Sequence, residues 1–520
     1  MPCHGLPRLL LPLAVALLMA GCTTVGPDFS PPETEWLEHW QPDLPRNSSQ
    51  APAPELKAAL LARWWTQFND PLLNQLMEEA DRGSLDLQLA ALAILENRAR
   101  LAQVAGTRYP QLQRLSAGLL AGGQDTGNGV IHARQATLGF DFAWELDFWG
   151  RYRRSIESAE AGFLASLANR QQAEAAVHAS VASLYFAYRT LARRIHIAQQ
   201  NARLQERSLE ITRAHYRSGN SSELDYQQAR TQYLGTLSSI PALQQAQRET
   251  RNALAVLLGR PPGPMPELEA LQETPLPDVP VEATRSLPAT ILLQRPDVRA
   301  SLWQAAAQSA RIGVAASALY PHLSIVGNVG WSSIQPADTR TTALLLGPFL
   351  SWDIFNYGRL ENAVLIEDSR LQQALTRYRA SVLGAAREVD DSASALYHVA
   401  EEIRLRQQAV QAARRALQIS QTSYQEGFTD FQRVLDAQRN LFLQEDSLVN
   451  ARGNLLQAGI NFYKSLGGGW TREELPRMLP AGMLEAMRKR SDWGPLIDRP
   501  LYPDQDDPTP PPDNREQETP

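Results

Sequence analysis

The sequence predicts an α+β fold in which one structural unit, strands followed by a long helical hairpin, occurs twice. Residues 144–151 (WELDFWGR) recur as residues 352–359 (WDIFNYGR), and residues 258–259 recur as residues 466–467, all at one offset of 208 residues. An offset that stays constant over such a distance requires rigid elements of fixed length between the motifs. A structural duplication is therefore the first inference from this chain.

Two segments between these motifs have the composition of unusually long helices. Residues 151–218 and 359–426 contain no proline and one glycine each. Both are rich in Ala, Gln, Arg, Glu and Leu, which are strong helix formers. Each segment has 68 residues, which as one helix would span roughly 100 Å at about 1.5 Å per residue. This length favours a coiled-coil-like assembly over an ordinary globular core.

Each long helix is expected to end at a glycine turn and to be followed by a returning helix. Gly219 and Gly427 suit the left-handed backbone conformation that often ends a helix. The returning helices are predicted over residues 222–258 and 430–466. Pro241 lies inside the first of them and should kink it.

Two further helical stretches, residues 71–106 and 296–319, each run into a Tyr-Pro motif, at Tyr109 and Tyr320. A returning helix and one of these stretches are together about as long as one unbroken long helix. We therefore expect the two pieces to stack end to end beside it.

Short strands are predicted between the Tyr-Pro motifs and the Trp-rich motifs. Residues 138–147 alternate between apolar and polar or small side chains, and residues 323–331 and 346–354 do so in the second copy. The pattern fits a barrel with lipid outside and water inside, although half-buried strands of a soluble sheet give it as well. If the strands cross a membrane, the four of one chain cannot close a barrel, so several chains must share one.

The amino terminus reads as a bacterial lipoprotein signal. Residues 1–21 contain Arg8, an apolar run over residues 9–20 and small residues at the end, as in a cleaved signal peptide. The segment before Cys22 resembles a lipobox, in which this Cys becomes the lipidated first residue. The alternative is an ordinary secretory signal with an incidental Cys. A lipid on Cys22 would anchor the chain to the membrane surface without spanning it.

The rest of the composition mainly excludes classes of function. The net charge is −6, and the basic residues are dispersed among acids, so nothing indicates nucleic acid. No Walker loop, zinc-protease motif, nucleophile elbow or paired-Cys motif is present, and the eight His are scattered. We expect no enzyme, no metal and no cofactor apart from the covalent lipid. Residues 499–520, rich in Pro and Asp, are expected to be a disordered tail.

Five short motifs accompany the duplication. They are Asp70-Pro71-x-Leu73, Ser84-Leu85-Asp86-Leu87, Arg295-Pro296-Asp297-Val298, Arg311-Ile312-Gly313-Val314-Ala315 and Leu435-Asp436-Ala437-Gln438-Arg439. With them the chain resembles, over roughly residues 22–475, the TolC/OprM superfamily of outer-membrane efflux channels. Within it, the resemblance is to the NodT-type lipoproteins of resistance-nodulation-division pumps.

The resemblance implies a fold and a set of partners. The fold would be a homotrimer with a 12-stranded β-barrel in the outer membrane, continued by a long α-helical barrel in the periplasm. The partners would be a periplasmic adaptor (membrane fusion protein), an inner-membrane proton-driven pump and outer-membrane lipid. The implied function is a passive exit duct for small molecules. Alternatives are a duct of a type I secretion system or, in a different class, a periplasmic coiled-coil scaffold.

The expected organisation of the chain follows from the duplication and the resemblance together. It is a signal peptide (1–21), an anchor with an equatorial segment and first helix (22–106), repeat 1 (107–259), an equatorial linker (260–295), repeat 2 (296–467), a second equatorial segment (468–498) and the tail (499–520).

The resemblance also assigns roles to the helix tips. The turns at Gly219 and Gly427 would form the tips where the adaptor docks. Asp225 and Asp436 match acidic positions of the family's periplasmic gate. The alternative for both is a solvated carboxylate near a helix N-terminus, which the helix dipole favours.

Two further tip residues bear on this gate. Tyr424 matches a tyrosine that holds neighbouring helices together in the family. Arg433 stands where some relatives carry a second acid, so the details of this gate are expected to differ.

Overall fold

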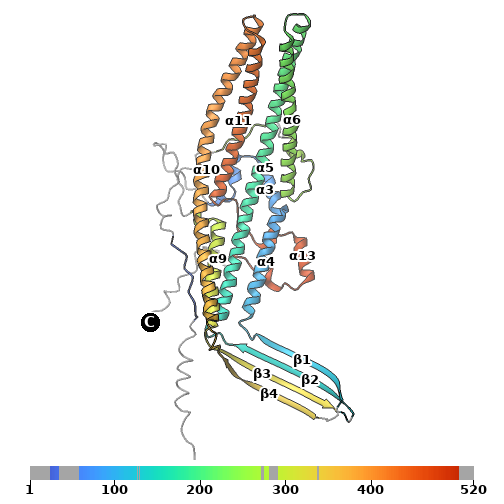
Figure 1. Ribbon diagram of the computed structural model, residues 1–520, viewed down its shortest axis with the longest axis vertical. Coiled ribbons are helices and arrows are strands. Elements are labelled where there is room, and N and C mark those ends of the chain that lie inside the picture. Colours follow the sequence, from blue (N-terminus) through green and yellow to red (C-terminus); the bar gives the residue numbers. More distant parts are fainter. Residues whose placement is uncertain are drawn as a thin grey trace, which may run out of the picture.

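The computed structural model describes residues 24–33, 58–125, 127, 129–270, 274–279, 291–335 and 339–502. The chain is elongated, with a four-stranded sheet at one end and the tips of two long helical hairpins at the other (Figure 1). The signal peptide, Cys22 and most of the first equatorial segment lie outside the described residues.

The duplication predicted from the motifs is present in the helices. Three pairs of helices match in length, with 67, 35 and 22 residues. The pairs are α5 (Arg151–Arg217) with α10 (Arg359–Gln425), α6 (Glu223–Leu257) with α11 (Phe431–Ser465), and α4 (Leu85–Gly106) with α9 (Pro296–Ser317). Both ends of the first two pairs keep the offset of 208, and both ends of the third keep one of 211.

The shorter helices stack end to end along the long ones, α6 above α4 beside α5 and α11 above α9 beside α10 (Figure 1). At the first junction two glycines bring the backbones together. A Cβ on Gly83 would lie 2.2 Å from the Leu258 carbonyl oxygen, and a Cβ on Gly259 would lie 2.2 Å from the Gly83 carbonyl oxygen. Helix α6 continues through Pro241, so the proline does not end it.

The strands form one antiparallel sheet in the order β1-β2-β3-β4. They are β1 (Leu112–Asp125), β2 (Val130–Glu145), β3 (His322–Gln335) and β4 (Thr339–Ser351). With 13 to 16 residues each, they are longer than the short strands expected. The apolar alternation fades in their outer halves, for example at residues 122–123 and 134–135, so the pattern marks only part of each strand.

The register gives the sheet one apolar and one polar face. Side chains on one face include Leu115, Leu138, Phe140, Val329, Trp331, Leu344 and Leu346, all exposed in the single chain. On the other face the Asn328 side-chain amide donates to Asp141 Oδ1 at 2.6 Å. Thr137, Ser332 and Thr341 share this polar face. This two-sided chemistry is that of a barrel wall between lipid and water.

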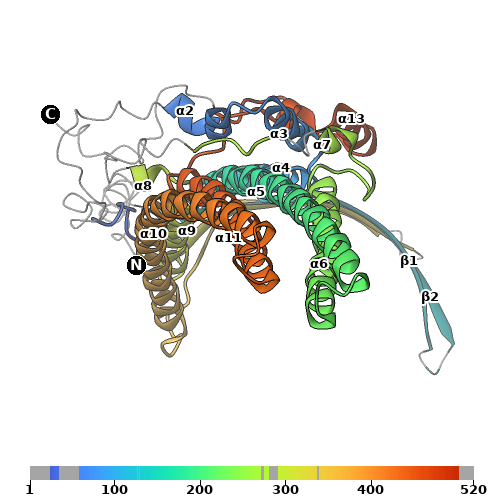
Figure 2. The ribbon, with the colours of Figure 1, turned by 90° about the horizontal axis from the view of Figure 1, so that it is seen from above.

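Short elements surround the middle of the helical bundle. They are α2 (Ala58–Ala62), η2 (Trp64–Phe68), α3 (Pro71–Gly83), α7 (Pro266–Glu269), α8 (Ile291–Gln294), α12 (Leu475–Met478), α13 (Ala481–Arg490) and η4 (Gly494–Leu496). Seen from above, α3, α7 and α13 lie on one side of the long helices, and the tips of α6 and α11 lie on the other (Figure 2). Trp64, Phe68 and Tyr185 are among the buried side chains that join these short elements to the long helices.

The predicted start of the disordered tail is wrong. The Arg98 guanidinium donates to the carbonyl oxygens of Leu496, Arg499 and Pro500, at 2.8 to 2.9 Å. The Leu501 side chain is 2% exposed. The composition of the tail does not reveal this contact, because all three hydrogen-bond donors belong to one distant side chain, that of Arg98. Residues 503–520 lie outside the described residues.

Within the part of the chain that the structure describes, no helix combines the length and the apolar character needed to cross a bilayer.

Gly259→Ala should destabilise the protein more than Gly219→Ala. Both glycines have φ near +76°, and a Cβ at either position meets the left-handed penalty of about 1–2 kcal/mol. Only at Gly259 would the new Cβ also collide with the Gly83 carbonyl oxygen, because Gly219 has nothing within 4 Å. Thermal unfolding of the two variants measures the difference. Equal unfolding midpoints for the two variants would show that the backbone contact between Gly83 and Gly259 can accommodate a Cβ.

Candidate functional site: the helix tips, the anchor segment and a buried polar cluster

The two helix tips are built by the same turn. Gly219 and Gly427 have φ of +76° and +78°. At one tip the Asn220 amide donates to the His215 carbonyl at 2.8 Å, and at the other the Phe428 amide donates to the Ser423 carbonyl at 2.8 Å. This is the hydrogen-bond pattern of a Schellman cap. Leu224 and Phe428, 65% and 81% exposed, give the tips apolar side chains that face solvent in the single chain.

Asp225 lies one turn into α6, where it caps the helix. Its carboxylate accepts hydrogen bonds from the Ser221 and Ser222 hydroxyls and from the Ser222 amide, and Ser222 Oγ in turn accepts from the Asp225 amide. Partial burial alone would raise the pKa of Asp225, but these hydrogen bonds outweigh it and lower the pKa. The carboxylate therefore stabilises the start of α6 in its ionised form. Its role in the pore stays a prediction.

Asp436 is exposed on α11 and has a basic partner. Its Oδ1 accepts from Arg439 at 2.7 Å and from Gln432 at 3.3 Å. Both members of the ion pair are more than half exposed. The structure thus places a cation beside the carboxylate that the resemblance assigns to the gate. The Asp-x-x-Arg spacing in the sequence already puts these side chains about one helical turn apart, although the motif by itself did not mark Arg439 as the partner of Asp436.

Tyr424 packs near the tip of the second hairpin. Its ring lies 5.2 Å from that of Phe431, centroid to centroid. Burial raises the pKa of Tyr424, and the charge of Asp225 on the first hairpin raises it further. The expected role of Tyr424 in holding neighbouring helices together stays a prediction.

A groove lies between the two returning helices below the tips. It has a volume of about 580 Å³ and is lined by side chains of α6 and α11, with Gln205 of α5. Many of them are amides and hydroxyls, including Gln227, Gln228, Thr231, Gln232 and Gln432, with Arg439 at its edge. Amide groups can form hydrogen bonds without fixing a charge, so this surface suits contact with water.

The segment that follows Cys22 is bound where the sheet meets the helices. The Val25 amide donates to the Trp149 carbonyl at 3.1 Å. Arg154, with a side chain 5% exposed, donates to the carbonyls of Val25 and Gly26 and to Asp28 Oδ1. Sequence reasoning missed Arg154, because nothing in the pattern of one helix shows what a distant terminus will contact.

Close packing holds this segment against α9. A Cβ on Gly26 would lie 2.4 Å from Gly313 Cα, and a Cβ on Gly313 would lie 2.6 Å from the Val25 carbonyl oxygen. The fixed segment brings the chain to Thr24, two residues after Cys22, at the junction of strand and helix.

Aromatic side chains mark the same junction. The rings of Trp149 and Tyr320 stack with centroids 4.5 Å apart, and Trp149 Nε1 donates to the Pro321 carbonyl. Trp352 Nε1 donates to the Leu319 carbonyl in the second repeat. Trp and Tyr gather where a membrane meets water. The junction therefore has the aromatic side chains typical of a membrane interface, and the segment that follows Cys22 lies beside it.

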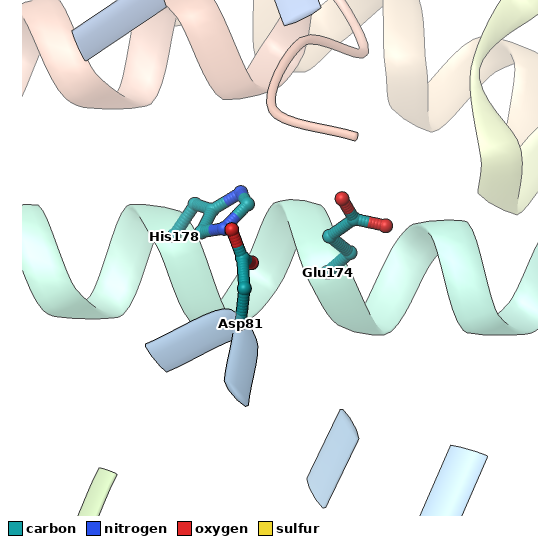
Figure 3. Close-up of side chains that lie close together, drawn as sticks. All are labelled: Asp81, Glu174 and His178. Carbon is teal, nitrogen blue, oxygen red and sulfur yellow. The ribbon is translucent and has the colours of Figure 1, made fainter. Parts of the chain in front are cut away.

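A third cluster lies in the middle of the molecule, where Asp81 of α3 meets Glu174 and His178 of α5 (Figure 3). One potential metal ligand atom from each lies within 4.8 Å of the others. His178 Nε2 lies 2.6 Å from Asp81 Oδ1, which is a direct hydrogen bond and leaves no place for an ion between them.

Glu174 already has its own partners. It accepts from Arg170 at 2.8 Å and from the Thr471 amide and hydroxyl at 3.2 Å. The cluster is therefore a hydrogen-bonded network as it stands. No pattern in the sequence marks this network, since Asp81 and His178 are far apart in the chain.

Comparison with known proteins agrees with this architecture. The profile of the outer membrane efflux protein family matches residues 76–260 and 287–468. The chain is 31% identical over 490 residues to the pyoverdine export outer membrane protein OpmQ of Pseudomonas putida, covering 91% of this chain and all of that protein. It is 30% identical to the toluene efflux pump outer membrane protein TtgC of Pseudomonas putida, over 89% of this chain and 96% of that one.

Solved structures show the same fold. The outer-membrane channel OprN superposes with a TM-score of 0.75 at 31% identity, covering 86% of this chain and 99% of its own. CusC superposes with a TM-score of 0.72 at 26% identity, covering 86% and 100%. The predicted fold class, the function as an efflux duct rather than an enzyme, and the outer-membrane location are thereby confirmed. The chain belongs to the outer membrane efflux protein family.

Proposed function

We propose that this protein acts as a homotrimeric, passive exit duct for small molecules, fed by a periplasmic adaptor and an inner-membrane pump of the resistance-nodulation-division type. The observation that carries the trimeric duct is the open sheet. Its edge strands β1 and β4 have no neighbour among the described strands, and open edges are not tolerated in lipid. Four strands from each of three chains would close a 12-stranded barrel.

The helices support the same head-to-tail assembly. Helix α4 leads into edge strand β1, and α10 follows edge strand β4. Exposed apolar side chains lie on α10, namely Leu365, Ile366, Leu383, Leu405 and Ile419, all at least half exposed. Others lie on α4 and α6, namely Leu85, Leu89 and Val256. A copy of the chain that extends the sheet would also bring these surfaces together, and a rotation that closes gives a ring.

The range of cargo in this proposal is broad. The names of relatives refer to pyoverdine, toluene and cations, which differ greatly in size and charge. The groove between α6 and α11 combines amide and hydroxyl groups with Leu435, Phe442 and Leu443, a mixed surface that does not select among such compounds. We therefore assign substrate choice to the pump and only passage to this protein.

We also propose that Cys22 carries the lipid. Support comes from the segment after it, which Arg154 holds at the membrane-proximal junction. From Thr24, two residues reach at most about 7 Å, so an acyl chain on Cys22 would enter the adjacent leaflet. An acyl chain attached farther from this junction would have to pass through water before it reached the membrane.

The trimer can be tested through the exposed face of α10. Leu383→Glu combined with Leu405→Glu would place charges where the neighbouring chain should pack, and burial of an unpaired charge is costly. Native mass spectrometry in mild detergent should show a trimer for the wild type and its loss in the variant. Lys489→Ala, on the exposed face of α13, is the control and should remain trimeric. A stable wild-type monomer would contradict the proposal.

The gate can be tested with a pair of opposite variants. If Asp436 and Arg439 line the pore, Asp436→Ala leaves three cations there and Arg439→Ala leaves three carboxylates. The cation-to-anion permeability ratio should fall about fivefold in the first and rise in the second, an order expected for unit charges about 4 Å from an ion in water. Reversal potentials in planar bilayers under a salt gradient measure this ratio.

Adding Tyr424→Phe to Asp436→Ala should increase the leak of the closed state, because a tip contact is lost. Equal reversal potentials in the wild type and both single variants would remove the pair from the pore. A wild-type protein without conductance would contradict the duct itself.

Cys22→Ser should abolish acylation but keep the fold. The strands carry their own apolar face, and the contacts of Arg154 with residues 25–28 do not involve the lipid. Intact-mass spectrometry and metabolic labelling with a fatty acid report on the modification, and native mass spectrometry reports on the trimer. An unmodified amino terminus in the native protein would contradict the assignment.

A further inference from the structure

His178 lies in the middle of α5, where three parts of the chain meet. Its Nδ1 is 2.8 Å from the Gly469 carbonyl oxygen, in the turn after α11, and its Nε2 is 2.6 Å from Asp81 Oδ1 of α3. The ring of Trp65, from η2, lies 4.5 Å away, centroid to centroid. The His178 side chain is 2% exposed, so water does not complete its hydrogen bonds.

Both ring nitrogens therefore face oxygen atoms that can only accept. A neutral imidazole has one N–H group, and its second nitrogen carries a lone pair. With either tautomer, that lone pair would point at the Gly469 carbonyl or at the ionised Asp81 carboxylate. Two hydrogen bonds of this length need two donors, and only the imidazolium supplies both.

The charges around His178 balance this cation. Asp81 faces it from α3, Glu174 lies one turn away on α5, and Glu473 lies in the segment after α11. Arg170 on α5 is bound to Glu174 at 2.8 Å. The two buried cations, on His178 and Arg170, thus stand against the carboxylates of Asp81 and Glu174. Removing one proton from His178 would leave either Asp81 or the Gly469 carbonyl without a donor from the ring.

We propose that His178 is a protonated latch, which fastens α5 to α3 and to the 467–469 turn and which opens when alkaline pH removes its proton. This inference does not depend on the proposed duct or on its partners. The proton has a route out, because the Asp81 side chain is 37% exposed. The latch would therefore respond to the pH of the surrounding compartment although His178 itself is buried.

The direction of the pH effect follows from the competing influences on the ring. Burial lowers the pKa of His178, but the hydrogen bond and charge of Asp81, together with the charge of Glu174, outweigh burial and raise the pKa. A raised pKa stabilises the closed latch fully below the ordinary His pKa of about 6.5. This contribution is lost as the pH rises through the raised value, by up to about tenfold in the closing equilibrium per pH unit.

Only one repeat carries the latch. At the offset of 208 residues, the position of His178 is taken by Ala386, a buried alanine of α10. Opening the latch would therefore release α5 from α3 and from the turn that follows α11. The corresponding position of α10 has no such contact to lose.

Hydrogen exchange in the full-length protein tests the latch. Peptides covering residues 467–471 should lose protection as the pH rises above the ordinary His pKa of about 6.5, after correction for the intrinsic exchange rate, by up to about tenfold per pH unit. In His178→Gln this pH dependence should disappear. In Asp81→Asn it should flatten as well, with protection kept at high pH, because an Asn amide can donate to the neutral ring. His215→Gln, at an exposed position of the same helix, should behave as the wild type.

Two results would overturn the proposal. The first is the same pH profile for residues 467–471 in the wild type and in His178→Gln. The second is a loss of wild-type protection with EDTA that zinc chloride restores, which would make the cluster a metal site. Thermal unfolding at pH 6 checks that each variant is folded. If His178→Gln does not fold, the pH profile of Asp81→Asn provides the test in its place.

Discussion

The unpaired backbone at the two edges of the sheet is the constraint on which the rest of the structure depends. In lipid, the amide and carbonyl groups of β1 and β4 must find partners. Since α4 leads into β1 and α10 leaves β4, any neighbour that completes the sheet also completes the wall of helices in the same order. The equal 67-residue lengths of α5 and α10 then bring both hairpin tips to the same height. A barrel in the membrane thus determines where the periplasmic end of the molecule lies.

Much of this could be predicted from the sequence because it rests on repetition and local propensity. The ends of α5, α10 and the returning helices followed to within one residue from motif spacing, and the absence of proline marked α5 and α10 as unbroken. The side-chain alternation of residues 138–147 gave the two faces of the sheet. Each of these features is visible in neighbouring residues, without knowledge of what lies across the molecule.

The site details could not be predicted because they join residues that are distant in the chain. Arg154 binds the carbonyls of Val25 and Gly26, and Arg98 binds those of residues 496–500. In both cases the partner is a backbone oxygen, which every residue has, so no sequence pattern marks it. The Asp436–Arg439 pair is the opposite case. Its spacing was visible, but attention to the carboxylate alone treated the site as an isolated negative charge.

The two repeats differ in the buried ion pairs that hold their long helices. In repeat 1, Asp70 at the start of α3 accepts from Arg189 of α5. In repeat 2, Arg295 at the start of α9 donates to Glu388 of α10. In each pair the arginine side chain is buried: that of Arg189 is 5% exposed and that of Arg295 is 8% exposed.

These pairs do not occupy equivalent positions of the duplication. At the offset of 208 residues, Glu388 of α10 corresponds to Ser180 of α5, which precedes Arg189 by nine residues. The lengths of α4 and α9 are equal, as are those of α5 and α10, because the packed wall of helices requires matching lengths. The buried charges are under no such requirement, since each arginine needs only one carboxylate within reach. The duplication therefore preserved the helices, while each repeat acquired its own ion pair.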